Sequence, residues 1–154
     1  MRVMTKTELS PEVTTENLHL AETLPIRVLI VDDHQIVREG LRRMLDMDKE
    51  IQVIGEAVDG EDAISKSMSL SPHVITMDLK MPGMDGIAAT TEIKKRNPGI
   101  SILMFTLYAG DLVQQAIESG ASGYLLKTSD GAQITKAIHQ VHGGLCPITP
   151  SLTW

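Results

Sequence analysis

Cysteine is almost absent from the 154-residue sequence, which contains only Cys146. A single thiol cannot form a disulfide within the chain, and this one lies among Gly, Pro and Thr residues with no partner for metal ligation. The sequence therefore argues against a disulfide scaffold and against a cysteine-based metal site.

Long apolar runs are also missing. No segment approaches the roughly 20 apolar residues that a membrane-spanning helix needs. The first residues lack the charged-then-apolar pattern of a secretory signal. We therefore expect a cytoplasmic protein that does not contact a membrane.

Positive charge is scarce, because 14 Lys and Arg residues stand against 20 Asp and Glu residues, for a formal net charge of −6. Binding to a phosphate backbone depends on clustered Lys and Arg side chains. The one basic cluster, Lys94-Lys95-Arg96, falls at the end of an expected helix, where cations complement the helix dipole. Direct nucleic-acid binding by this chain is therefore not expected.

The remaining composition, 42% hydrophobic and 22% charged, fits one α/β domain. Residues 1–25 are rich in Thr and Glu without a sustained period, and we expect a flexible N-terminal extension, with a short helix over 12–21 as the alternative. Residues 26–143 form the expected domain. Residues 144–154 are expected to be a C-terminal tail or a truncated linker.

Short apolar strands and amphipathic helices alternate across the expected domain, which is typical of right-handed βαβ units with a parallel sheet. The third strand is nearly all apolar, as a central strand covered on both faces should be. The expected strands are 26–31, 51–57, 74–77, 100–105 and 123–126, and the expected helices are 35–47, 60–71, 87–96, 111–119 and 130–142.

Polar residues follow four of these strands: Asp32 and Asp33, Asp78, Thr106 and Lys127. The carboxyl ends of parallel strands share one edge of the sheet, where ligands bind. Crowded carboxylates repel one another unless a cation lies among them, and Mg²⁺ prefers oxygen ligands. The sequence therefore predicts a Mg²⁺-dependent acidic pocket with Asp78 as a candidate nucleophile.

Phosphoryl transfer would use each of these residue types, because it depends on positioning and on cations that neutralise the phosphoryl oxygens. In this interpretation Asp32 and Asp33 hold Mg²⁺ beside Asp78. Lys127 supplies a second positive charge, and the Thr106 hydroxyl donates to a phosphoryl oxygen. Each residue alone has an ordinary structural explanation, such as a helix cap or a solvated turn, but their shared position favours function.

The chain resembles a two-component response-regulator receiver domain in the segments VLIVDDHQIVREGLRRML, VITMDLKMPGMDGI, ILMFT and GASGYLLK, over about residues 26–143. The DDH triplet, the GYLLKTSD segment and the GG turn are most similar to receivers of NarL/FixJ-type transcription regulators. The resemblance implies a CheY-like fold, a flavodoxin-like doubly wound (βα)5 sandwich with a five-stranded parallel sheet in the order 2-1-3-4-5.

The resemblance also implies a phosphoacceptor and a metal site. Asp78 is the implied phosphoacceptor, taking its phosphoryl group from a sensor histidine kinase or a phosphotransfer protein. Asp33 and Asp78 would bind Mg²⁺ directly, Asp32 would help through water, and the main-chain carbonyl of Lys80 would complete the protein ligands. Beyond its own phosphorylation and dephosphorylation, such a domain is not an enzyme.

By the same resemblance Thr106 and Tyr124 form a switch pair, and Lys127 contacts the phosphoryl group. Phosphorylation would switch a protein-interaction face to control transcription through an output domain absent from this chain. A homodimer formed on phosphorylation is a further expectation. The expected members of this face are Leu112, Gln115, Ser119, Tyr124 and Ala132. One departure is Thr128, which stands where many receivers have a proline.

Other functions remain open. The chain could be a stand-alone receiver that signals by protein contact rather than part of a longer regulator. A haloacid-dehalogenase-type phosphatase also uses a strand-end Asp with Mg²⁺, but it needs a second Asp two residues later, where this chain has Lys80. A flavin-binding module would have its phosphate repelled by Asp32-Asp33, and a pseudo-receiver is disfavoured by the intact site.

Overall fold

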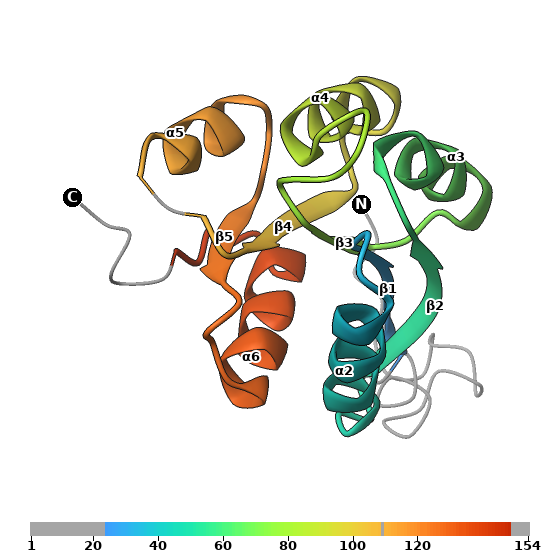
Figure 1. Ribbon diagram of the computed structural model, residues 1–154. Helices are drawn as coiled ribbons and strands as arrows, with labels where there is room; N and C mark the ends of the chain where they lie inside the picture. Colours follow the sequence, from blue (N-terminus) through green and yellow to red (C-terminus); the bar gives the residue numbers. More distant parts are fainter. Residues whose placement is uncertain (1–23, 109, 149–154) are drawn as a thin grey trace, which may run out of the picture.

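The computed structural model describes residues 24–108 and 110–148 (Figure 1). Five parallel strands form one sheet in the order β2-β1-β3-β4-β5, with helices on both faces (Figure 1). The strands are β1 (Ile26–Val31), β2 (Ile51–Ala57), β3 (Val74–Met77), β4 (Ser101–Thr106) and β5 (Gly123–Leu126). The helices are α2 (Gln35–Asp46), α3 (Gly60–Leu70), α4 (Gly86–Arg96), α5 (Asp111–Glu118) and α6 (Gly131–His142). The predicted α/β class, doubly wound topology and strand order are confirmed.

The fourth strand begins and ends one residue later than predicted. Ile100 was expected in the strand, but its N–H donates to the carbonyl of Asn97 in the preceding turn. Thr106 was expected just after the strand, but it pairs with Leu126 as the last residue of β4. Its side chain is therefore held by the sheet rather than by a loop.

The core has two layers, one on each face of the sheet. Ile93 of α4 and Ala116 of α5 belong to the layer that also includes α3, whereas Leu45 of α2 and Ile138 of α6 belong to the opposite layer. All four side chains are fully buried. Burying one large aliphatic side chain contributes about 1.5–3 kcal/mol to the stability of the fold. The two core layers therefore stabilise the sheet that positions the strand ends.

Three aspartates cap helices. The side chains of Asp59, Asp85 and Asp130 each accept a hydrogen bond from the main-chain N–H three residues later, at the starts of α3, α4 and α6. Such a cap contributes about 1 kcal/mol. These acids therefore have a structural role that is separate from the strand-end acids.

The C-terminal segment continues the sheet beyond β5. The N–H of Tyr124 donates to the carbonyl of Pro147 at 2.9 Å, and Tyr124 forms a parallel bridge with Ile148. The start of the expected tail is thus in contact with the domain. The expected helix over 12–21 lies outside the described residues, and the division into extension, domain and tail stays a prediction.

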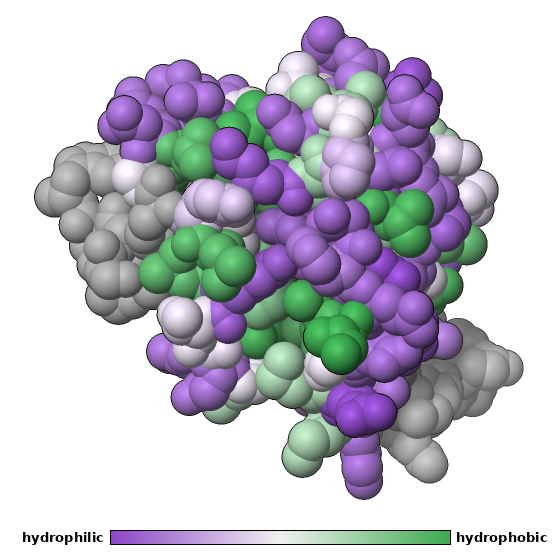
Figure 2. Space-filling model, in the orientation of Figure 1, coloured by the Kyte–Doolittle hydropathy of each residue, from purple (hydrophilic) through white to green (hydrophobic). Residues whose placement is uncertain are grey.

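The surface in Figure 2 is mainly hydrophilic, with apolar residues in separate patches rather than one continuous area. Scattered apolar residues are normal on a folded domain. Among the described residues, none of the helices has the length and apolar character needed to cross a bilayer.

Candidate functional site

The ends of β1 and β3 bring the predicted acids together. Asp32, Asp33, His34 and Asp78 each present one potential ligand atom, and these atoms all lie within 4.8 Å of one another. β1 and β3 are neighbours in the sheet. Asp32 and Asp33 directly follow β1, and Asp78 directly follows β3. Adjacent parallel strands therefore account for the proximity of acids that are 46 residues apart in sequence.

Asp32 is buried, and its carboxylate and main-chain atoms all form hydrogen bonds. Its Oδ1 accepts from the N–H of His34 at 2.8 Å, and its Oδ2 accepts from Lys127 Nζ at 2.6 Å. Its own N–H donates to the carbonyl of Ala57, and its carbonyl accepts from the guanidinium of Arg38 at 2.7 Å. Asp32 is therefore a fixed part of the pocket wall.

Asp33 differs, because its Oδ1 is buried and accepts no hydrogen bond from the described residues. The nearest basic group is His34 Nδ1 at 3.2 Å, on a side chain that is 67% exposed. An anionic oxygen removed from water without a donor is costly. This oxygen, together with the Asp32 and Asp78 carboxylates, makes a donor set that suits a hard divalent cation.

Asp78 and Lys127 form a buried charge pair at the centre of the pocket. Lys127 Nζ lies 3.2 Å from Asp78 Oδ2, and the N–H of Leu79 donates to Asp78 Oδ1. Burial and the charge of Asp32 raise the pKa of Asp78, although Lys127 partly opposes the shift. Burial alone would lower the pKa of Lys127, but the carboxylates of Asp32 and Asp78 raise it. The pocket thus has more negative charge than its lysine can balance.

The excess of negative charge makes the metal-free pocket less stable with Asp78 ionised. In metal-free buffer at pH 7.5, Asp78→Asn is expected to raise the melting temperature by roughly 3 °C. The raised pKa means that ionised Asp78 is less favourable in the folded chain than in the unfolded chain, and an amide oxygen can keep the hydrogen bond from Leu79. Calorimetry on both proteins measures the shift, and a lower melting temperature for Asp78→Asn would contradict it.

Thr106 and Tyr124 meet at the main chain of Tyr108. The Thr106 Oγ1 accepts from the N–H of Tyr108 at 3.3 Å, and the Tyr124 hydroxyl donates to the carbonyl of Tyr108 at 2.6 Å. Burial and the charge of Asp78 raise the pKa of Tyr124 to about 12, so its hydroxyl stays protonated as a donor. Both predicted switch residues therefore hold the same loop residue.

One surface prediction is wrong for Tyr124. This side chain was expected among the members of an exposed face, but it is fully buried in the core layer formed with α3, α4 and α5. The ring fills the interior and its hydroxyl finds a main-chain acceptor, which is the usual requirement for a buried tyrosine. Gln115 and Ala132 are exposed as expected.

An open cavity of about 410 Å³ leads to Asp78, with walls that include His34, Leu107 and Lys127. Lys80 also lines it, and its Nζ lies 5.3 Å from the ring centroid of Tyr108. No pattern in the sequence predicts this contact between Lys80 and Tyr108, because the two residues lie on separate loops. The Lys127–Thr128 peptide bond is trans.

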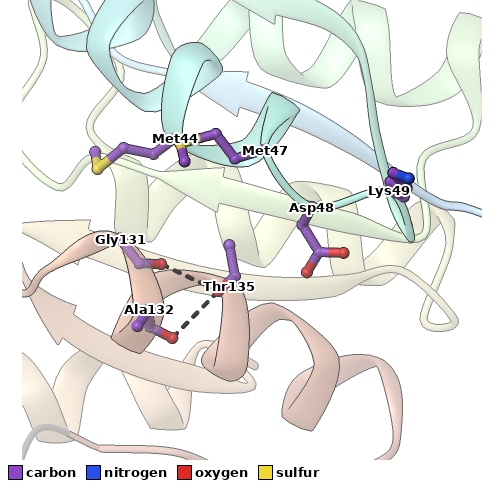
Figure 3. A pocket seen from close by; sticks show the side chains of 7 residues that line it. All are labelled: Met44, Met47, Asp48, Lys49, Gly131, Ala132 and Thr135. Carbon is purple, nitrogen blue, oxygen red and sulfur yellow. Dashed lines mark hydrogen bonds between the residues drawn. The ribbon is translucent and has the colours of Figure 1, made fainter.

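Another hollow, of about 480 Å³, lies between α2 and α6, away from the acids (Figure 3). Met44, Met47 and Thr135 are among its lining residues. Asp48 also lines it, but its carboxylate is paired with His139 at 2.9 Å. The cavity that opens onto Asp78 is therefore the candidate site.

Comparison with known proteins gives the family. The protein-family model for the response regulator receiver domain matches residues 28–139. The response regulator protein VraR of Staphylococcus epidermidis is 42% identical over 130 residues, which cover 84% of this chain and 62% of the relative. The transcriptional regulatory protein LnrK of Bacillus subtilis is 40% identical over 129 residues, covering 83% of this chain and 59% of the relative. The chain thus spans about 60% of the length of these curated relatives.

Solved structures agree with the family match. A LuxR-family two-component response regulator from Aurantimonas has a TM-score of 0.80 at 37% identity, covering 83% of this chain and 92% of that one. The receiver domain of the NarL response regulator from Mycobacterium tuberculosis has a TM-score of 0.76 at 34% identity, covering 79% and 98%. With the fold, the strand-end acids and these matches together, the chain belongs to the response-regulator receiver domain family of two-component signalling proteins.

Proposed function

We propose that Asp78 accepts a phosphoryl group from a sensor histidine kinase or a phosphotransfer protein. The observation that carries the proposal is the Asp78 carboxylate, buried beside Asp32 and Asp33 and 3.2 Å from Lys127, at the end of an open cavity. In the reaction, an Asp78 oxygen forms a bond to phosphorus while the phosphorus–nitrogen bond of the donor phosphohistidine breaks. The histidine leaves with the bonding electrons, and an acyl phosphate forms.

Asp33 and Asp78 would hold Mg²⁺ directly, with Asp32 acting through water and the main-chain carbonyl of Lys80 as a further ligand. Mg²⁺ in this position would neutralise the phosphoryl oxygens during transfer. The Asp33 Oδ1 atom supports this assignment, because it is buried and accepts no hydrogen bond from the described residues, as a buried carboxylate oxygen would need.

Lys127 would change partners during the reaction. Its ammonium now bonds the Asp32 and Asp78 carboxylates, and a phosphoryl group on Asp78 would offer it new acceptor oxygens. A covalent phosphate adds about −1.5 to −2 units of charge. A cation already held beside the nucleophile can meet this charge without a large movement.

The switch would act through Tyr108. The Thr106 Oγ1 accepts from the Tyr108 N–H and still has its own proton to donate to a phosphoryl oxygen. The Tyr124 hydroxyl donates to the carbonyl of the same Tyr108, so a movement of Thr106 toward the phosphoryl group would act on this residue. Phosphorylation would thereby bias the loop between β4 and α5, and with it the surface formed by α5, β5 and α6. The requirement is a two-state equilibrium of this loop.

We further propose that this receiver is a cytoplasmic part of a longer transcription regulator rather than an enzyme that acts on separate substrates. The VraR and LnrK relatives extend beyond the matched length. RcsB, a structural neighbour at 30% identity, has been solved as dimers bound to DNA. By that likeness, phosphorylation would favour a homodimer of this chain while another segment bound DNA.

Mass spectrometry tests the phosphoacceptor directly. Wild-type protein incubated with acetyl phosphate and Mg²⁺ is expected to gain roughly 80 Da, the mass of one phosphoryl group. Asp78→Asn is expected to gain nothing, because the amide is not a nucleophile for this reaction. A gain in both proteins, or in neither, would overturn the assignment of Asp78.

A further inference from the structure

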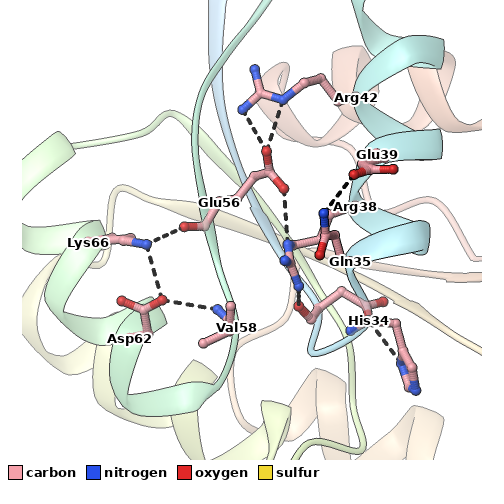
Figure 4. A network of polar contacts seen from close by, with 10 residues as sticks. His34, Gln35, Arg38, Glu39, Arg42, Glu56, Val58, Asp62 and Lys66 are labelled. Atoms are coloured by element: carbon pink, nitrogen blue, oxygen red, sulfur yellow. Dashed lines mark hydrogen bonds and ion pairs between the residues drawn. The ribbon is translucent and has the colours of Figure 1, made fainter.

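Arg38 connects the acidic pocket to β2. One guanidinium nitrogen donates to the main-chain carbonyl of Asp32 at 2.7 Å. The Nε atom donates to Glu56 Oε1 at 3.0 Å (Figure 4). The arginine side chain is only 12% exposed. A planar guanidinium can serve two acceptors at fixed angles, so Arg38 ties the start of the pocket loop to the neighbouring strand.

The loop that Arg38 contacts is short and contains Asp32 and Asp33. Residues 32–34 join β1 to α2, and Arg38 lies one turn into that helix. The Asp32 side chain is fixed from the other direction by Lys127. The main chain between Asp32 and Asp33, which orients the Asp33 carboxylate, is therefore fixed on the helix side by Arg38.

Arg42 provides a natural comparison one turn further along α2. It binds the other oxygen of the same carboxylate, with 3.0 Å from its Nε to Glu56 Oε2. Its side chain is 38% exposed, and no contact between it and the pocket loop is recorded among the described residues. Arg38 and Arg42 thus share a helix, a charge and Glu56 as partner (Figure 4). Of the two, only Arg38 has a hydrogen bond to Asp32 among the described residues.

We propose that Arg38 is a positioning residue for the divalent cation, and that Glu56 holds it in place. Among the described residues, Arg38 makes no hydrogen bond to the carboxylates of Asp32, Asp33 or Asp78. It acts by fixing the main-chain carbonyl of Asp32, so that the Asp33 carboxylate faces the pocket before the cation arrives. This inference rests on the proposed function of the acidic pocket as a Mg²⁺ site.

The direction of the change in Mg²⁺ affinity after loss of Arg38 distinguishes an effect of charge from an effect of positioning. Removing a positive charge near an acidic pocket should, by charge alone, strengthen binding of a cation. Loss of positioning should weaken it, because partners that orient metal ligands commonly affect metal affinity by about 10–100-fold. Weaker Mg²⁺ binding after loss of Arg38 would therefore report positioning rather than charge.

Isothermal titration with Mg²⁺ would compare wild type, Arg38→Met and Arg42→Met. Arg38→Met is expected to raise the Mg²⁺ dissociation constant by about tenfold. Arg42→Met, which removes the same charge and the same carboxylate partner, should bind within about twofold of wild type or slightly more tightly. Equal dissociation constants for the two variants would overturn the proposal, as would tighter binding by Arg38→Met.

A kinetic measurement gives a second readout. With acetyl phosphate as donor, the Mg²⁺ concentration for half-maximal phosphorylation should rise in Arg38→Met, while the rate at saturating Mg²⁺ should return close to the wild-type value. A lower saturated rate with unchanged Mg²⁺ dependence would contradict a positioning role.

Two further variants cover the case in which Arg38→Met does not fold. Arg38→Lys keeps the charge but cannot serve both acceptors with a planar fork, and Glu56→Gln keeps Arg38 but weakens its anchor. Both are expected to weaken Mg²⁺ binding, and wild-type affinity in both would refute the proposal. If wild type itself bound no Mg²⁺, the proposed function would fail instead, so the two failures are distinguishable.

Discussion

Gly86→Ala is expected to lower the free energy of unfolding by about 3 kcal/mol, at the upper end of the usual cost of overpacking. A Cβ at this position would overlap the carbonyl oxygen of Asp78 and would lie 3.0 Å from the Cα of Leu79. The Gly86 N–H also donates to the Leu79 carbonyl at 2.8 Å, which holds the two segments together. Because the obstructing atoms are main chain, relief requires movement of Asp78 itself.

Urea denaturation of the metal-free protein measures this cost, and Gly40→Ala is its matched control. Gly40 lies inside α2, and a Cβ there would meet no atom within 4 Å. Alanine in an exposed helix interior is favoured over glycine by about 1 kcal/mol, so this variant should be more stable than wild type. Similar effects of the two alanines would show that the contact with Asp78 does not constrain the fold. The phosphorylation rate of Gly86→Ala should also fall, because its nucleophile has moved.

Lys127→Met is expected to destabilise the metal-free protein by about 3–5 kcal/mol, the usual cost of removing one partner of a buried ion pair. Lys127 is 11% exposed and lies within 2.6 Å of Asp32 and 3.2 Å of Asp78. Without its ammonium, the buried carboxylates of Asp32 and Asp78 lose the counter-charge that contacts both of them. Phosphorylation by acetyl phosphate is expected to be lost as well.

Thermal unfolding of Lys127→Met with and without Mg²⁺ would show how much of the lost stability comes from the missing positive charge and how much from altered packing. Added Mg²⁺ should recover part of the lost stability, and Asp78→Asn in the Lys127→Met background should recover part of it without metal. Lys95→Met is the control, since Lys95 is 68% exposed and 3.6 Å from Glu92, and such surface pairs contribute about 0–1 kcal/mol. If Lys127→Met were as stable as this control, the pocket would not depend on its lysine.

The arrangement of the strand ends could be predicted because it depends on the order of apolar and polar residues along the chain. The runs before Asp32 and Asp78 are apolar enough to be central strands, and parallel strands put their last residues at one edge. The proximity of Asp32, Asp33 and Asp78 in the structure agrees with that reasoning. Their roles in binding Mg²⁺ and phosphoryl groups remain predictions.

Contacts between helices and strands were harder to anticipate. Arg38 and Glu56 are 18 residues apart, and each occupies an amphipathic element where a charged residue usually faces solvent. Only the crossing of α2 over the sheet turns them toward each other. The position of Tyr124 had the same difficulty, because tyrosine is accommodated both in a core and at a surface.

The two outer edges of the sheet are protected in different ways among the described residues. The chain's own Pro147 and Ile148 already pair with Tyr124 on β5. On β2, Lys66 Nζ donates a hydrogen bond to the main-chain carbonyl of Glu56 at 2.5 Å. The register of the pairing between β2 and β1 also shifts near Gly55. Charged groups and bulges are the means by which natural sheets resist the addition of foreign strands. Self-association of this receiver should therefore proceed through helical surfaces, with neither sheet extended from one molecule into the next.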